Sequence, residues 1–132
     1  MTKKLGILGG LGPMASVYFY ELLTRHTEAT CDQEHLDLIL SSGATTPDRT
    51  AFILGNSPAD PLPRMLEDAR VLVSAGADTI AIPCNTAHYF YDALAEALPV
   101  PVINIIYETV HALSAMGVKT FGLLATDRKS VG

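Results

Sequence analysis

The chain has 132 residues, of which 48% are hydrophobic and 17% are charged, and its formal net charge is −5 at pH 7. That length allows one domain with a buried core, and the composition is that of a folded protein rather than a disordered one. The acidic balance argues against nucleic acid as a partner, because phosphate binding needs a basic face. Since no run of 18 apolar residues occurs, we also expect no membrane-spanning segment and no membrane partner.

The amino-terminal residues and the cysteines bear on the cellular compartment. Residues 1–4 lead into a short strand-like run, without the apolar stretch and cleavage site of a signal peptide. Cys31 and Cys84 therefore predict two reduced thiols rather than a disulfide. We expect a cytoplasmic protein.

Short apolar runs alternate with helical segments along the chain. This alternation predicts right-handed βαβ units, and hence an α/β lobe with an open parallel sheet and helices on both faces, of the flavodoxin-like kind. The clearest amphipathic helix has apolar residues on one face and a capping glycine, Gly76, at its end. In chain order we expect strand Leu5–Leu8, helix Met14–Thr30, strand Leu36–Leu40, a short helix Thr50–Leu54 in a long loop, helix Leu62–Ser74, strand Thr79–Ile82, helix Thr86–Leu98, strand Val100–Ile103, helix Ile105–Met116 and strand Thr120–Leu124.

The predicted domain organisation depends on the last expected strand, Thr120–Leu124. No helix follows Thr120–Leu124, and a parallel strand without its helix leaves one sheet face uncovered. We therefore predict that residues 1–117 form one lobe and that residues 118–132 contain the first strand of a second lobe missing from this chain. An uncovered strand can also pair with another copy, which predicts a homodimer.

A glycine loop follows the first expected strand. Gly10–Ala15 fits the dinucleotide pattern G-x-G-x-x-A between a strand and a helix. Two features argue against NAD as a ligand. Pro13 lacks a backbone N–H that could bind the pyrophosphate, and the second strand ends in Ser41–Ser42, where an Asp or Glu would be needed to bind the ribose. The loop is then either a tight packing turn or a place where backbone N–H groups meet a small carboxylate.

The segment Ile80–His88 is the most informative stretch. It places the thiol of Cys84 after a buried parallel strand, at the edge where open α/β sheets bind ligands. A helix is expected to begin at once, with Asn85 or Thr86 as N-cap, and the free N–H groups of a helix start favour a thiolate. The same groups can bind a carboxylate. The alternative is a small buried hydrophobic residue, which is what most free cysteines are.

Three segments together resemble the aspartate/glutamate racemase family: Gly9–Pro13, Pro47–Thr50 and Pro83–His88. The resemblance runs from about Lys4 to Asp127. It implies a cofactor-independent enzyme of two similar lobes, each with one cysteine, that exchanges the α-proton of a small acidic amino acid between two thiols. Related isomerases and decarboxylases share this architecture.

The resemblance also implies roles for individual residues of this chain. Cys84 is one acid/base thiol, and Arg49 contacts a substrate carboxylate, for which its planar fork is suited. Asn85 and Thr86 bind the α-carboxylate region. Further substrate-binding residues are Gly10, Gly12 and Thr126, and no metal is implied.

The second catalytic cysteine and a lysine of the family belong to the other lobe and have no counterpart here. Cys31, near the end of the first helix, is expected at the opposite edge of the sheet. Arg128–Lys129 stands where a Gly-Thr pair is common, which makes the last five residues candidates for a non-native tail. We therefore expect no racemase turnover from the monomer. A non-catalytic carboxylate-binding or assembly module, and a Rossmann-type nucleotide binder, are the alternatives; His88 is expected to tune the thiol or to hydrogen-bond the loop.

Overall fold

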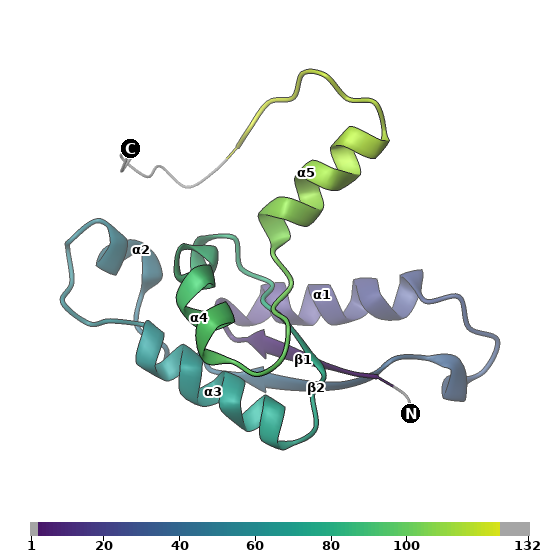
Figure 1. Ribbon diagram of the computed structural model, residues 1–132, viewed down its shortest axis with the longest axis horizontal. Coiled ribbons are helices and arrows are strands. Elements are labelled where there is room, and N and C mark those ends of the chain that lie inside the picture. The colour runs from purple at the N-terminus through teal and green to yellow at the C-terminus, as the bar shows by residue number, and fades with distance from the viewer. Residues whose placement is uncertain (1–2, 125–132) are drawn as a thin grey trace.

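The computed structural model describes residues 3–124 and contains a parallel sheet (Figure 1). Its strands are β1 (Lys4–Gly9), β2 (Asp37–Ser42) and β3 (Thr79–Ala81), in the order β2-β1-β3. Leu5 pairs with Leu38 on one side and with Thr79 on the other. The open parallel sheet predicted from the sequence is confirmed.

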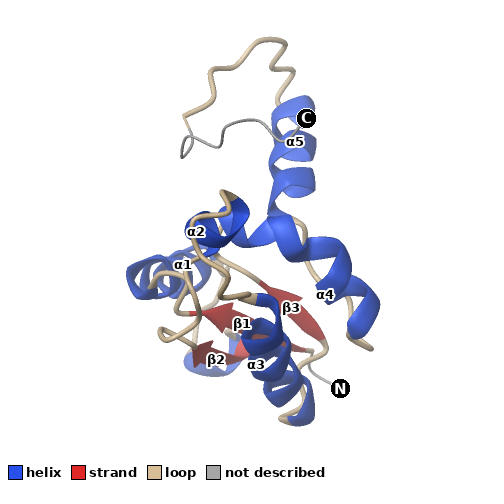
Figure 2. Ribbon diagram, turned by 90° about the vertical axis from the view of Figure 1, so that its left-hand side faces the viewer, coloured by secondary structure: helices blue, strands red, loops and turns tan. Residues whose placement is uncertain are grey.

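Helices cover both faces of the sheet, as predicted. The chain crosses from β1 to β2 through α1 (Pro13–His26) and returns past β1 to β3 through α3 (Leu62–Ser74). Because both crossovers are right-handed and run in opposite directions, α1 and α3 must lie on opposite faces. Figure 2 shows this arrangement, with α4 (Tyr91–Ala97) on the same side as α3. No helix in residues 3–124 is both long and apolar enough to cross a membrane.

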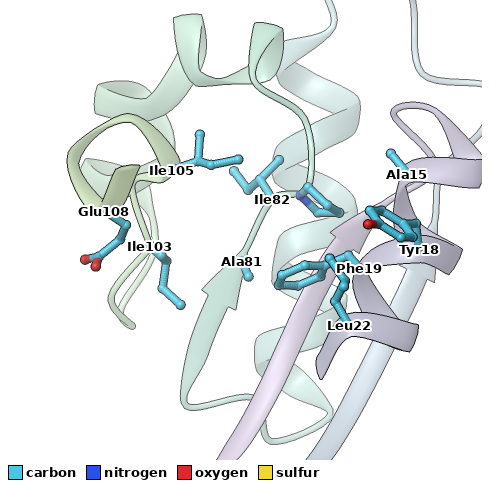
Figure 3. A pocket seen from close by; sticks show the side chains of 10 residues that line it. Ala15, Tyr18, Phe19, Leu22, Ala81, Ile82, Ile103, Ile105 and Glu108 are labelled. Carbon is cyan, nitrogen blue, oxygen red and sulfur yellow. The ribbon is translucent and has the colours of Figure 1, made fainter. Parts of the chain in front are cut away.

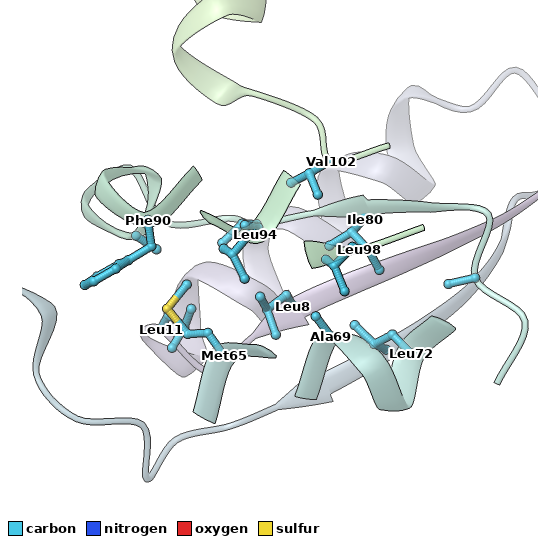
Figure 4. Packing of buried hydrophobic residues seen from close by; sticks show 13 residues of the cluster. Leu8, Leu11, Met65, Ala69, Leu72, Ile80, Phe90, Leu94, Leu98 and Val102 are labelled. Atoms are coloured by element: carbon cyan, nitrogen blue, oxygen red, sulfur yellow. The ribbon is translucent and has the colours of Figure 1, made fainter. Parts of the chain in front are cut away.

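The hydrophobic core lies between the sheet and the layer of α3 and α4 (Figure 4). One stripe of α3 supplies Met65, Ala69 and Leu72, which are all buried, as the helical spacing predicts. Opposite them lie Leu8 of β1 and Leu94 of α4. This layer fixes the positions of the strand ends, from which the site loops emerge.

Two predicted elements differ in form from the sequence expectation. The expected helix Thr86–Leu98 is a 3₁₀ helix, η2 (Thr86–Phe90), that passes directly into α4. The expected strand Val100–Ile103 is reduced to one bridge, between Val102 and Ile80. Proline explains this, because Pro101 has no N–H to donate and can only accept, through its carbonyl oxygen, from Ile80 N–H at 2.9 Å.

The carboxyl-terminal part differs most from the prediction. Helix α5 (Ile105–Ala115) projects away from the sheet, and none of its residues is buried (Figure 1). The expected strand Thr120–Leu124 is wrong, because these residues form no strand in the structure. A strand needs a neighbour for its N–H and C=O groups, and no strand in the described part of the chain pairs with this segment. The prediction that residues 118–132 belong to a second lobe stays a prediction, and residues 125–132 lie outside the described range.

Candidate functional site

Cys84 occupies the turn that follows the carboxyl end of β3. The turn is tight, because Cys84 N–H donates to the Ile82 carbonyl at 2.8 Å, and the side chain is half-buried. The 3₁₀ helix η2 begins two residues later. Asn85 holds the N-cap position of η2, one of the two positions expected, but its side chain makes no capping hydrogen bond.

The glycine loop packs against the loop that follows β2. Gly10 has a φ of 83°, in the left-handed region that favours glycine, and its N–H donates to the buried Ser16 Oγ at 2.9 Å. Gly43 N–H donates to the Gly9 carbonyl at 3.0 Å and joins the two loops. Gly12 is the N-cap of α1, ahead of Pro13. With the Gly10 donor already used inside the protein and Pro13 lacking one, the loop is poor in free donors for a dinucleotide pyrophosphate.

Arg49 begins the short helix α2 (Arg49–Ile53), which confirms the expected helical turn in this loop. Asp48 caps it by accepting from Ala51 N–H at 2.6 Å. One terminal nitrogen of Arg49 donates to the carbonyls of Thr46, at 3.4 Å, and Pro47, at 3.1 Å. Its Nε is buried and, among residues 3–124, has no hydrogen-bond partner. A buried donor without a partner is costly, and a bound carboxylate would satisfy it.

The base of the same loop is held by charge and by a buried hydroxyl. Thr46 Oγ1 donates to the Gly43 carbonyl at 2.6 Å. Arg64 of α3 forms an ion pair with Asp68 at 3.0 Å and reaches Thr45 Oγ1 at 3.4 Å. The hydrogen bond to Asp68 raises the pKa of the Arg64 guanidinium. Arg64 is thereby paired with Asp68, whereas Arg49 Nε has no hydrogen-bond partner among the described residues.

The structure brings most of the predicted site residues to one edge. The glycine loop, the Arg49 loop and the Cys84 turn follow the carboxyl ends of β1, β2 and β3, which meet at one edge because the strands are parallel. In Figure 1, α2 lies on the side toward which the β1 arrow points. Phe52 of α2 packs on Phe90 of η2, with ring centroids 5.9 Å apart, and so joins the Arg49 and Cys84 segments. Thr126 lies outside the described residues.

Cys31 is placed where the sequence predicts. It is exposed and precedes η1 (Asp32–Glu34) in the connection from α1 to β2, at the amino ends of the strands. Cys31 and Cys84 are therefore at opposite edges of the sheet. Within residues 3–124 no group of three or more His, Cys, Asp or Glu side chains is arranged to hold a metal ion.

Two further residues hold the loops at this edge, and the sequence indicated a role for His88 but none for Ser16. Ser16 holds the glycine loop, and the signal available was a small polar residue one turn into a helix that follows such a loop. His88 is buried and contacts the backbone of the Cys84 turn: its Nδ1 lies 2.8 Å from the Cys84 carbonyl oxygen. Of the two roles expected for His88, the hydrogen bond to the loop is the one found.

An apolar cavity also borders this edge, since Pro83, the neighbour of Cys84, is in its lining. The cavity has a volume of about 390 Å³ and opens between α1 and the start of α5, on the α1 side of β3 (Figure 3). Tyr18 and Phe19 line one wall and Ile103 the other, and Glu108 is the single charged residue in the lining. An apolar cavity whose one charge is negative does not suit an acidic amino acid, so we do not place the substrate there.

Comparison with known proteins agrees with this geometry. A family model described as Asp/Glu/hydantoin racemase matches residues 8–132. The broad specificity amino-acid racemase RacX of Bacillus subtilis (strain 168) is 31% identical over 113 residues, which are 80% of this chain and 47% of that protein.

Solved structures show the same fold. Picrophilus torridus aspartate racemase has 35% sequence identity and a TM-score of 0.80, over 87% of this chain and 48% of that one. An aspartate racemase homologue from Pyrococcus horikoshii OT3 has 24% identity and a TM-score of 0.70, over 89% of this chain and 50% of that one. The chain thus spans about half the length of these relatives. The family match covers residues 8–132, and so extends the resemblance from three short segments to nearly the whole chain. The chain therefore belongs to the Asp/Glu/hydantoin racemase family.

Proposed function

We propose that this chain supplies one acid/base thiol, Cys84, to a cofactor-independent racemase that acts on aspartate or glutamate. The observation that carries the proposal is the shared edge, where the Cys84 turn, the Arg49 loop and the glycine loop meet. Family membership supplies the reaction class, and this edge is where open parallel sheets bind ligands.

In the proposed reaction, the Cys84 thiolate takes the α-proton of the amino acid and becomes a thiol. The electron pair of the broken C–H bond stays on the substrate and spreads into its α-carboxylate, whose charge the site must stabilise. Inversion then needs a proton delivered to the opposite face by a second acid. Cys31 is at the wrong edge of the sheet, so we place the second acid outside residues 3–124, in the half that the relatives possess and this chain does not match.

We propose that a charged side chain binds one substrate carboxylate and that backbone N–H groups bind the other. The unpartnered Nε of Arg49 offers a charged donor for one of them. The first N–H groups of a helical turn have no partner inside the turn, so those after Cys84, at Asn85 and Thr86, are suited to the α-carboxylate. Gly12 and Thr126 complete the proposed set, while Gly10 contributes through the shape of its loop because its N–H is already used.

The test is α-proton exchange in D₂O, followed by ¹H NMR, with both enantiomers of aspartate and of glutamate. A single thiol on one face predicts exchange of one enantiomer with retention of configuration, because proton removal and deuteron return use the same sulfur. Cys84→Ala should abolish this exchange, while Cys31→Ser, the matched loss of the other thiol, should leave it unchanged. Arg49→Ala should weaken binding of the exchanging enantiomer about 10- to 100-fold, by loss of a charge-assisted bond.

Two outcomes would redirect the proposal. Exchange that survives Cys84→Ala would remove Cys84 as the base. Saturable binding of aspartate or glutamate without any exchange would instead support the alternative, a carboxylate-binding or assembly module of the same fold. The homodimer and the cytoplasmic location remain predictions from the sequence.

A further inference from the structure

We propose that His88 is a positioning residue that locks the Cys84 turn to the start of α5, so that the thiol and the segment leading out of the lobe keep one fixed relation. The inference concerns a hydrogen-bonded link through an imidazole ring, and it stands whether or not Cys84 is the racemase base.

The ring of His88 bonds to backbone on both sides. Nδ1 lies 2.8 Å from the Cys84 carbonyl oxygen, and Nε2 accepts from Ile105 N–H at 3.1 Å. Since a carbonyl can only accept, Nδ1 must carry the proton, and in the neutral ring this leaves Nε2 as the acceptor that Ile105 requires. The longer 3.4 Å approach of Nε2 to the Ile103 carbonyl is the weaker alternative. Neither nitrogen is paired with the Cys84 sulfur, so the ring acts on the turn and not directly on the thiol.

The Ile105 bond completes the amino terminus of α5. A helix start leaves its first N–H groups without intrahelical partners. Asn104 Oδ1 accepts from Ile106 at 3.0 Å and from Tyr107 at 3.1 Å, which satisfies the second and third of them. His88 satisfies the first, from a residue 17 positions earlier in the chain. The start of α5 is therefore capped partly by its own N-cap residue and partly by the Cys84 segment.

Tyr91 holds the ring in place. Its ring lies nearly parallel to the imidazole, at 7° with centroids 6.2 Å apart, and its hydroxyl donates to the Val102 carbonyl at 3.2 Å. His88 is 7% exposed. The imidazole ring of His88 is thus held against residues 102–105, the segment to which it and Tyr91 are hydrogen-bonded. Helix α5 itself has no buried residue. These two side chains therefore tie the start of α5 to the Cys84 turn, in addition to the backbone bridge between Val102 and Ile80.

Two substitutions of His88 each remove one of its two hydrogen bonds, to Cys84 or to Ile105. Both are made in a chain that also carries Cys31→Ser, so that Cys84 is the one cysteine that can be alkylated. His88→Asn keeps an N–H donor where Nδ1 was and loses the acceptor for Ile105. His88→Gln keeps an acceptor near the Nε2 position and loses the donor to Cys84. The readouts are the rate of Cys84 alkylation by iodoacetamide and amide hydrogen exchange at Ile105, and neither needs racemase activity.

We expect each of the two variants to change a different readout. His88→Gln should speed alkylation about two- to tenfold, because the half-buried thiol is less firmly held, with Ile105 exchange near wild type. His88→Asn should speed Ile105 exchange by a similar factor with alkylation near wild type, and His88→Ala should raise both. Equal changes of both readouts in the Asn and Gln variants, or no change in any, would overturn the proposal.

A measurement on the unsubstituted chain keeps the proposal testable if the variants do not fold. ¹⁵N NMR of His88 should show a protonated Nδ1 and an unprotonated Nε2. The opposite tautomer would be incompatible with the link, because Nδ1 would then face the Cys84 carbonyl without a proton.

Discussion

Gly10 meets two separate constraints at the edge of the site. Its φ of 83° is strained for any residue with a side chain, and an added Cβ would lie 2.5 Å from the backbone nitrogen of Gly43. Gly55, with a φ of 74° and nothing within 4 Å of an added Cβ, meets only the first. The two glycines therefore separate conformational strain from the close approach of two loops.

We expect Gly10→Ala to lower the free energy of unfolding by at least about 2 kcal/mol, since backbone strain and a backbone clash act together. Gly55→Ala, the control, should cost about 1 kcal/mol from strain alone. Urea unfolding followed by circular dichroism measures both. Equal losses in the two variants would show that the loop after β2 moves aside and that the contact with Gly43 is unimportant.

At the scale of single residues, the sequence located Cys84 well because its place depends on local order: a buried apolar run, then Pro83, then a turn. Arg49 was placed by the resemblance and lies at the same edge. The partner of Ser16 and the distant partner of His88 were not predictable, because each depends on which backbone group lies opposite once the chain has folded. Ser16 meets Gly10 N–H across the glycine loop, and His88 meets Ile105 N–H, 17 positions away.

Among the elements, α3 contributes most to the core and contacts both β1 and β2. Met65 is fully buried, whereas Val71 on the same helix is 59% exposed. We expect Met65→Ala to cost about 2–5 kcal/mol, because it removes buried apolar surface and leaves a cavity. Val71→Ala should stay within about 0.5 kcal/mol of wild type. Thermal and urea unfolding give both values, and a small loss in Met65→Ala would mean that the core between α3 and the sheet is loosely packed.

Helix α5 should respond to the loss of its cap without loss of the fold. Asn104→Ala removes the acceptor for Ile106 and Tyr107 N–H, which costs a helix about 0.5–2 kcal/mol. Because α5 buries no residue, we expect faster amide exchange in its first turn and an unchanged midpoint of global unfolding. Ser114→Ala, an exposed position on the same helix, is the control. A lowered global midpoint would instead show that α5 belongs to the cooperative unit of the lobe.

The mispredicted elements have two physical causes. Periodicity and proline placement identified α1, α3 and the three strands of the sheet, whose partners are close in the fold. Thr120–Leu124 has a strand-like sequence, yet a strand forms only beside another strand. The helix after Cys84 has nearly its predicted bounds, but residues 86–90 adopt the tighter 3₁₀ form, which hydrophobic spacing does not distinguish from the first turns of an α-helix.

Over the whole molecule, apolar surface is concentrated on the side of α5. Ile106 is 53% and Val110 55% exposed on that helix, and Leu124 beyond it is fully exposed. The apolar cavity beside Phe19 and Ile103 opens at the base of the same helix. Large exposed apolar patches are typical of contact surfaces, which keeps the predicted homodimer plausible by a route other than strand pairing.

We expect the chain to self-associate at micromolar concentration through this surface. Val110→Glu puts a charge in the apolar stripe of α5 and should shift the mass measured by sedimentation velocity toward the monomer. Ala112→Glu adds the same charge on the opposite side of the helix and should leave association unchanged. A wild-type chain that sediments as a monomer, or equal effects of both variants, would contradict the prediction.

The opposite placement of the two thiols has a practical consequence for every such experiment. The six residues of β1 span about 20 Å, and Cys31 and Cys84 flank the two ends of the sheet, whereas a disulfide needs α-carbons within about 7 Å. Oxidation of a stored sample therefore cannot close a ring within one molecule and instead joins two molecules, most readily through the exposed Cys31. Such covalent pairs would imitate a homodimer in a sizing column, and would disappear on adding reductant or in Cys31→Ser.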